Sequence, residues 1–154
     1  MTSKANLSNW NFLIGEFEGE ATEDTGEGKI ITTAKFDYYP SNQFIRGTFE
    51  SNNEEGLVNR GEYFLYIDPY KDKFLRKVVF SYGFVNNEIS YYFDETTIKF
   101  ETLVEPSPKQ FEGITWRSFM HKISNNEIEF GLENSQNGKD FKLYNKTKLR
   151  KINN

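Results

Sequence analysis

The chain has 154 residues, a formal net charge of −4, a hydrophobic content of 36% and an aromatic content of 17%. This length and apolar content suit one domain with a sizeable core, and no linker or composition shift divides residues 1–154. The acidic balance argues against a nucleic-acid surface or an anionic membrane surface, because both select for clustered Lys and Arg. The absence of cysteine excludes disulfides, thiol catalysis and thiolate metal sites.

The N-terminus has no apolar core of signal-peptide length, and no apolar stretch approaches the roughly 20 residues that cross a bilayer. We therefore expect a cytoplasmic protein that binds neither nucleic acid nor membrane. Removal of a leader from the chain would leave secretion open as an alternative.

A short helix is predicted near the N-terminus. Trp10, Leu13 and Ile14 have the i, i+3, i+4 spacing of one helical face, which predicts a helix that begins at Ser8 and ends at Ile14. Ser8 is the expected N-cap, because its hydroxyl can accept a backbone N–H bond. Gly15 then permits a sharp change of direction at the helix end.

The apolar period changes to two after Gly15, which predicts a strand. Phe17, Gly19 and Ala21 share one face, and the acidic residues Glu16, Glu18 and Glu20 share the other. Three carboxylates on one strand face are expected outside, because burying them together is too costly.

Nine further strands are predicted from alternating patterns between turn signals. Their ranges are 29–39, 44–51, 60–67, 74–83, 88–93, 97–104, 113–123, 127–134 and 140–150. The turn signals between them include residues 24–28, 52–56, 85–87, 124–126 and 135–138, and a break at Pro106 and Pro108.

About ten consecutive strands joined by short turns must either close or expose long edges that invite aggregation. We therefore predict an all-β fold, an antiparallel up-and-down barrel of about ten strands with a short N-terminal helix. A barrel of this size is wider than its side chains can fill, so an internal ligand cavity follows. The alternative is a two-sheet sandwich, which would need long crossovers that the sequence does not show.

The opening helix and the Gly15-Glu16-Phe17 strand resemble the calycin group of lipocalin-like barrels, whose first strand carries Gly-x-Trp. In this chain Phe17 stands where the group has Trp. The group places an Arg of the last strand over that aromatic ring, and Arg150 is the matching residue. The resemblance implies a cation–π contact that closes one end of the barrel.

Further motifs extend this resemblance to lipocalin-like domains over nearly the whole chain. They are Gly15-x-Phe17-x-Gly19, Phe44-Ile45-x-Gly47, Asp68-Pro69 and Ser135-x-Asn137-Gly138. Nitrobindin and the fatty-acid-binding-like barrels are more distantly similar. Nitrobindin binds haem through a His close to the C-terminus, and this chain has no His there.

Arg117 and His121 are the first candidate ligand-binding residues. They alternate with Trp116 and Met120 on one predicted strand, so the direction of that strand decides their role. If Arg117 and His121 point inward, they can fix a carboxylate, phosphate or carbonyl group of a ligand, and His121 could bind haem iron. If Trp116 and Met120 point inward, Arg117 and His121 lie on the surface.

Four tyrosines and another arginine complete the candidate set. Tyr63, Tyr82, Tyr91 and Tyr144 could offer hydroxyls to a cavity or could simply complete the core. Arg46 alternates with apolar residues and is either a ligand contact or part of a solvated strand face.

Catalytic and metal templates lack their parts in this sequence. There is one His, no Cys, no Gly-x-Ser-x-Gly and no phosphate-binding loop, so we predict no metal site and no cofactor. The first hypothesis is a barrel, monomeric or homodimeric, that binds a small hydrophobic or aromatic ligand. The alternatives are a cofactor-free isomerase, cyclase or lyase on the same barrel, and a haem-binding barrel.

Overall fold

The computed structural model describes residues 4–21, 28–103 and 112–152, and these form one short 3₁₀ helix and ten strands. The elements are η1 (Leu7–Leu13), β1 (Gly15–Ala21), β2 (Ile31–Tyr38), β3 (Ile45–Asn53), β4 (Gly56–Asp68), β5 (Lys73–Phe80), β6 (Val85–Phe93), β7 (Thr97–Thr102), β8 (Thr115–Ser124), β9 (Glu127–Ser135) and β10 (Lys142–Lys151). The break predicted at Pro106 and Pro108 and most of the turn predicted at 24–28 lie outside the described residues.

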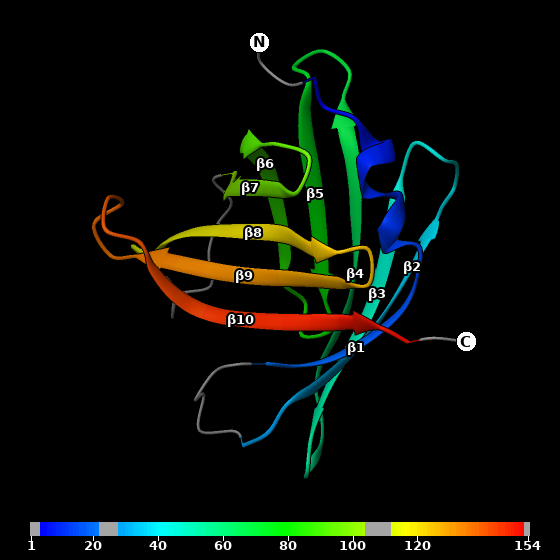
Figure 1. Cartoon of the computed structure of the whole chain (residues 1–154). Helices are drawn as coiled ribbons and strands as arrows, with labels where there is room; N and C mark the ends of the chain where they lie inside the picture. The colour runs from blue at the N-terminus through cyan, green and yellow to red at the C-terminus, as the bar shows by residue number, and fades with distance from the viewer. Residues whose placement is uncertain (1–3, 22–27, 104–111, 153–154) are drawn as a thin grey trace.

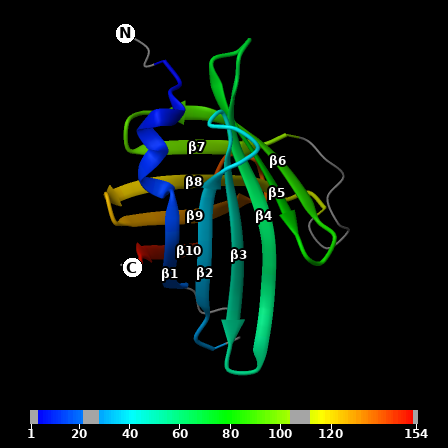
Figure 2. The ribbon, with the colours of Figure 1, turned by 90° about the vertical axis from the view of Figure 1, so that its right-hand side faces the viewer.

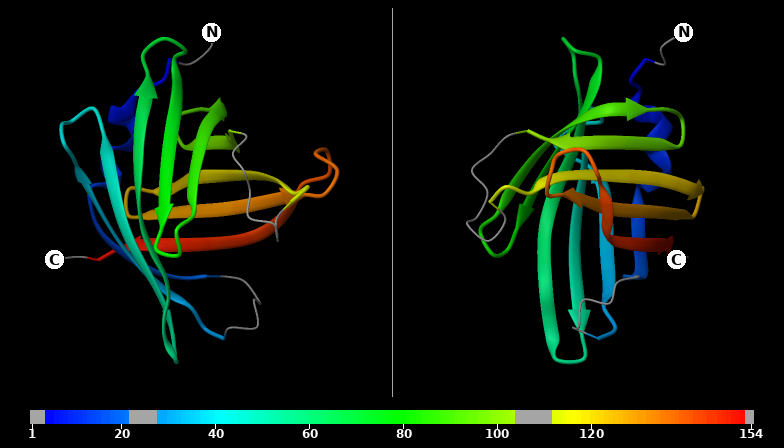
Figure 3. Two further views of the ribbon diagram at one scale, coloured as in Figure 1. Left: turned by 180° about the vertical axis from the view of Figure 1, so that it is seen from behind. Right: turned by 90° about the vertical axis from the view of Figure 1, so that its left-hand side faces the viewer.

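Each strand pairs antiparallel with the next, and β1 also pairs with β10, so the sheet closes on itself. In Figure 1 strands β8, β9 and β10 lie side by side and cross β3, β4 and β5. Strands β3 and β4 extend beyond their neighbours at one end (Figure 2, Figure 3). The closed antiparallel barrel is confirmed, and closure excludes the sandwich.

Two local predictions are wrong. The helix is capped by Asn6, not by Ser8: the Asn6 side chain accepts the backbone N–H of Ser8 at 3.0 Å. Residues 85–87 belong to β6, and the turn before it lies at residues 81–84. That turn is closed because the Phe80 N–H donates to the Phe84 carbonyl at 2.9 Å and Gly83 adopts a φ of +87°.

The helix end of the barrel is closed by a packed apolar core. Its fully buried members are Trp10, Leu13, Phe17, Ile45, Leu65, Phe74, Ile98, Phe100, Met120 and Ile128. Helix η1 runs directly into β1 (Figure 2). It is tied to other strands at this end, since Tyr38 donates to the Asn11 side chain and the Lys122 ammonium lies 4.7 Å from the Phe12 ring centroid.

Lys151, not Arg150, covers the aromatic ring of the first strand. Phe17 and Lys151 are cross-strand partners, so both point into the barrel, and the Lys151 Nζ lies 5.6 Å from the Phe17 ring centroid. The same Nζ donates to the Phe12 carbonyl at 2.9 Å. Arg150 points outward, with its side chain 76% exposed, and pairs with Glu127 at 2.6 Å. The contact expected for Arg150 is therefore made by the next residue, Lys151.

We predict that Lys151→Ala lowers the free energy of unfolding by about 1–2 kcal/mol, because the helix end loses a charge-assisted hydrogen bond and a cation–π contact. Arg150→Ala is the matched control and should cost less than about 1 kcal/mol, as expected for an exposed ion pair. Urea unfolding of both variants measures the difference. Equal losses would show that Lys151 does not fasten the helix.

Candidate functional site

A cavity of about 400 Å³ lies inside the barrel, beyond the packed core. Its lining comes from β2 to β10 and includes Phe49, Asn59, Tyr63, Arg76, Val78, Phe80, Tyr82, Phe84, Glu88, Thr102, Trp116, Ser118, Phe130, Leu132 and Tyr144. Tyr82 and Tyr144 are 66% and 48% exposed, so the cavity reaches solvent at the end opposite η1. A cavity of this size suits a small organic molecule.

Aromatic rings surround the mouth of the cavity. Phe80, Tyr82 and Phe84 stack on one another around the turn before β6, with ring centroids 5.3 to 6.3 Å apart. Trp116 and Tyr144 meet edge to face at 5.2 Å. These rings give the entrance a flat apolar surface on which a planar ligand could stack.

An ion pair lies deeper in the cavity. Arg76 and Glu88 are cross-strand partners on β5 and β6, and the Arg76 Nε donates to a Glu88 carboxylate oxygen at 2.5 Å. Ser118 on β8 joins them, because its hydroxyl accepts from the Arg76 Nη2 at 2.7 Å and donates to the other Glu88 oxygen at 2.6 Å. The Glu88 side chain is 1% exposed, so this charge is held almost entirely away from bulk water.

The hydroxyl of Tyr63 is buried beside this ion pair and makes no hydrogen bond among the described residues. Burial raises the pKa of Tyr63, so the side chain stays a neutral phenol that can donate and accept. The Asn59 Oδ1 and the Thr102 hydroxyl also line the cavity and also lack partners in the described part of the chain. Buried polar atoms are normally satisfied, so these groups indicate a place for a polar ligand group or water.

Three of the seven residues proposed from sequence, Tyr63, Tyr82 and Tyr144, line the cavity. Strand β8 turns Trp116, Ser118 and Met120 inward, which places Arg117 on the outer face. The Arg117 guanidinium lies 3.9 Å from the Phe141 ring centroid, and Tyr91 is 41% exposed on the same outer face. The arginine that lines the cavity is Arg76, and Arg117 does not line it.

Arg46 and His121 also lie outside the cavity. Arg46 forms an ion pair with Asp37 at 2.9 Å and covers the Tyr39 ring, as expected for a solvated strand face. The His121 Nδ1 is hydrogen bonded to the Thr97 hydroxyl at 2.9 Å on the outside of β8. His121 therefore lies outside the cavity and could not ligate the iron of a haem group bound there.

The sequence contains a pattern that predicts Arg76 and Glu88 as an inward-facing pair, although the alternation within each strand does not single them out. Phe74, Arg76, Val78 and Phe80 alternate on β5, so a charge interrupts an otherwise apolar face. A charge in that position needs a partner of opposite sign, and Glu88 lies in register on the next strand. Looking for opposite charges on two adjacent inward faces would have found both residues.

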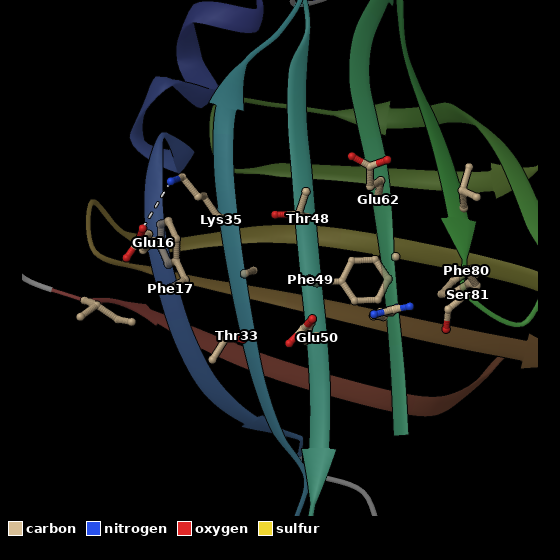
Figure 4. Close-up of a pocket in the computed structure, with 15 residues that line it drawn as sticks. Glu16, Phe17, Thr33, Lys35, Thr48, Phe49, Glu50, Glu62, Phe80 and Ser81 are labelled. Carbon is tan, nitrogen blue, oxygen red and sulfur yellow. Dashed lines mark ion pairs between the residues drawn. The ribbon is translucent and has the colours of Figure 1, made fainter. Parts of the chain in front are cut away.

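A second, larger hollow of about 730 Å³ lies along the outer wall formed by β1 to β5 (Figure 4). Exposed side chains of both signs border it, including Glu16 and Lys35, which pair at 3.5 Å. Among the described residues, none that lines this hollow carries one of the buried unpartnered polar atoms. The smaller interior cavity is therefore the better candidate site.

No protein-family model matches the chain, and no curated protein matches it significantly. Among solved structures, the chain is similar to the crystal structure of Rv2717c from M. tuberculosis, with a TM-score of 0.69 and 13% sequence identity. The similarity covers 96% of this chain and 97% of that chain. At this identity it shows the barrel fold alone.

The described residues contain no helix long and apolar enough to span a bilayer. Nor do they contain a group of three His, Asp or Glu side chains placed to hold a metal ion.

We predict that Arg76→Met destabilises the protein by about 3–5 kcal/mol, because it leaves the Glu88 carboxylate buried without its partner. The double variant Arg76→Met with Glu88→Leu should recover most of that loss, since it removes both charges. Arg117→Met is the control on the outer face and should cost less. Guanidinium unfolding measures all three, and equal losses in Arg76→Met and the double variant would contradict the role given to the ion pair.

The buried Tyr63 hydroxyl should make the stability of the protein depend on alkaline pH. The unfolded pKa of Tyr63 is the ordinary value of about 10, whereas burial raises the folded pKa, so unfolding releases a proton above pH of about 10. The contribution of Tyr63 to stability is therefore complete below that pH and falls above it. Above that pH the free energy of unfolding of wild type should fall by about 1.4 kcal/mol per pH unit more than that of Tyr63→Phe. If the free energies of unfolding of wild type and Tyr63→Phe fell equally above a pH of about 10, the Tyr63 hydroxyl would be exposed to solvent, which would contradict its burial.

Proposed function

We propose that the protein binds a small apolar or aromatic molecule inside the barrel. One observation carries the proposal: an aromatic-lined cavity of about 400 Å³ ends on the buried, unpartnered hydroxyl of Tyr63 beside the Arg76–Glu88 ion pair. The rings supply contact area for the body of a ligand, and the polar groups fix its orientation.

The Tyr63 hydroxyl supports this assignment because an unsatisfied buried polar group has a free-energy cost. A ligand oxygen or nitrogen at this position would satisfy the phenol and gain a hydrogen bond in a low-dielectric site. Thr102 and Asn59 lie on the same lining and offer further polar atoms. The site therefore combines apolar contact with a few polar contacts.

The arrangement also supports a relationship to lipocalin-like barrels, as the motifs around Gly15 and Phe17 imply. The Lys151 contact with Phe17 stands where that group has a basic residue over an aromatic ring. This relationship would make the protein a carrier or sensor of its ligand, although fold by itself does not fix function.

A proton-transferring enzyme on the same barrel is the second candidate, because the Glu88 carboxylate lies on the cavity lining. Both Glu88 oxygens are engaged, one by Arg76 and one by Ser118. A substrate proton would therefore compete with Arg76 and Ser118 for the Glu88 carboxylate. This competition makes catalysis the second candidate and binding the first.

Titration with the neutral fluorescent dye N-phenyl-1-naphthylamine tests the proposal. Val78 and Val79 are adjacent on β5 but lie on opposite faces: Val78 lines the cavity and Val79 lines the outer hollow. We predict that wild type binds one dye per chain and that Val78→Phe weakens binding at least about ten-fold by filling the cavity. Val79→Phe, the matched control, should bind as wild type does.

The opposite result, with weaker binding in Val79→Phe and unchanged binding in Val78→Phe, would move the site to the outer hollow. Circular dichroism checks that both variants keep the strand signal of wild type. Absence of dye binding by folded wild type would contradict a ligand-binding interior.

A further inference from the structure

The charge of the cavity lining restricts the ligand further. Arg76 and Glu88 are the only charged residues on the lining among the described residues, and they pair with each other at 2.5 Å. The other polar residues on the lining, among them Tyr63, Thr102 and Ser118 near this pair, are uncharged. The inner end of the cavity therefore carries charges of both signs but no net charge.

An anionic ligand would enter this cavity at a cost. Its carboxylate or sulfonate would lose water and would meet a guanidinium already shared between Glu88 and Ser118. The Glu88 carboxylate would also lie close to it, and like charges repel strongly in a buried site. No second cation lines the described part of the cavity to compensate.

An uncharged polar group meets no such obstacle. A carbonyl, amide or hydroxyl can accept from the Tyr63 hydroxyl or the Thr102 hydroxyl, and a ligand N–H or O–H can donate to the Asn59 Oδ1. Phe49, Phe80 and Phe130 line the same space and suit a ring system.

Building on the proposed function, we propose that the cavity takes an uncharged aromatic molecule with a hydrogen-bonding group and rejects the anionic form of the same skeleton. The Arg76–Glu88 pair is the element that sets this preference, because each charge cancels the other. Removing the negative partner should reverse the preference.

A matched pair of dyes tests the proposal. N-phenyl-1-naphthylamine is neutral, and 1-anilinonaphthalene-8-sulfonate has the same skeleton with an added sulfonate. We expect wild type to bind the neutral dye at least about ten-fold more tightly than the anionic dye. Only binding that Val78→Phe weakens is counted, since that substitution blocks the interior cavity.

Glu88→Gln provides the second arm. It leaves Arg76 without its counter-charge while keeping an oxygen that can accept from the guanidinium. We expect the ratio of the two affinities to shift toward the anionic dye by about ten-fold or more. Glu62→Gln is the control, because Glu62 lies on the outer face and its replacement changes the net charge of the protein equally.

Each outcome decides the question. Equal or tighter interior binding of the anionic dye by wild type overturns the proposal and leaves the ligand-binding function standing. Equal shifts of the ratio in Glu88→Gln and Glu62→Gln also overturn it, because net charge would then be the cause. Interior binding of neither dye contradicts the proposed function itself. If Glu88→Gln does not fold, the wild-type ratio alone supports or overturns the preference.

Discussion

The ion pair between Arg76 and Glu88 divides the interior of the barrel into two parts. Toward η1 the space is filled by apolar side chains such as Trp10, Phe17 and Phe74. Toward the other end the space is open and lined by aromatic rings. A buried pair contributes little net stability by itself, but losing either partner is costly, so both residues must be present together. The pair therefore fixes where the packed core ends and where the cavity begins.

The closed end depends on a second basic residue. Lys151 reaches the Phe12 carbonyl of η1 and lies over Phe17, so it joins the last strand, the first strand and the helix. Gly15 leaves room for the Lys151 stem, because an added Cβ would lie 2.7 Å from the Lys151 Cε. With one end fixed in this way, access to the cavity lies at the opposite end, where Tyr82 and Tyr144 are exposed.

The sequence predicted the barrel well because alternation and turn residues act locally. The inward faces of β1 and β2 follow directly from Phe17, Ala34 and Phe36. The site was harder to predict, because Arg117 and Arg76 both alternate along a strand, and choosing Arg76 requires matching its charge with that of Glu88 on the next strand. The shift from Arg150 to Lys151 arises because a register change of one residue exchanges the two faces.

The central claim is that the ligand lies inside the barrel, and methyl NMR with N-phenyl-1-naphthylamine tests it most directly. The account predicts intermolecular NOEs from the dye to the methyl groups of Val78 and Leu132, which line the cavity. The methyl groups of Val79, which lies on the outer wall, should show none. NOEs to Val79 without NOEs to Val78 or Leu132 would place the ligand on the outer wall and contradict the account.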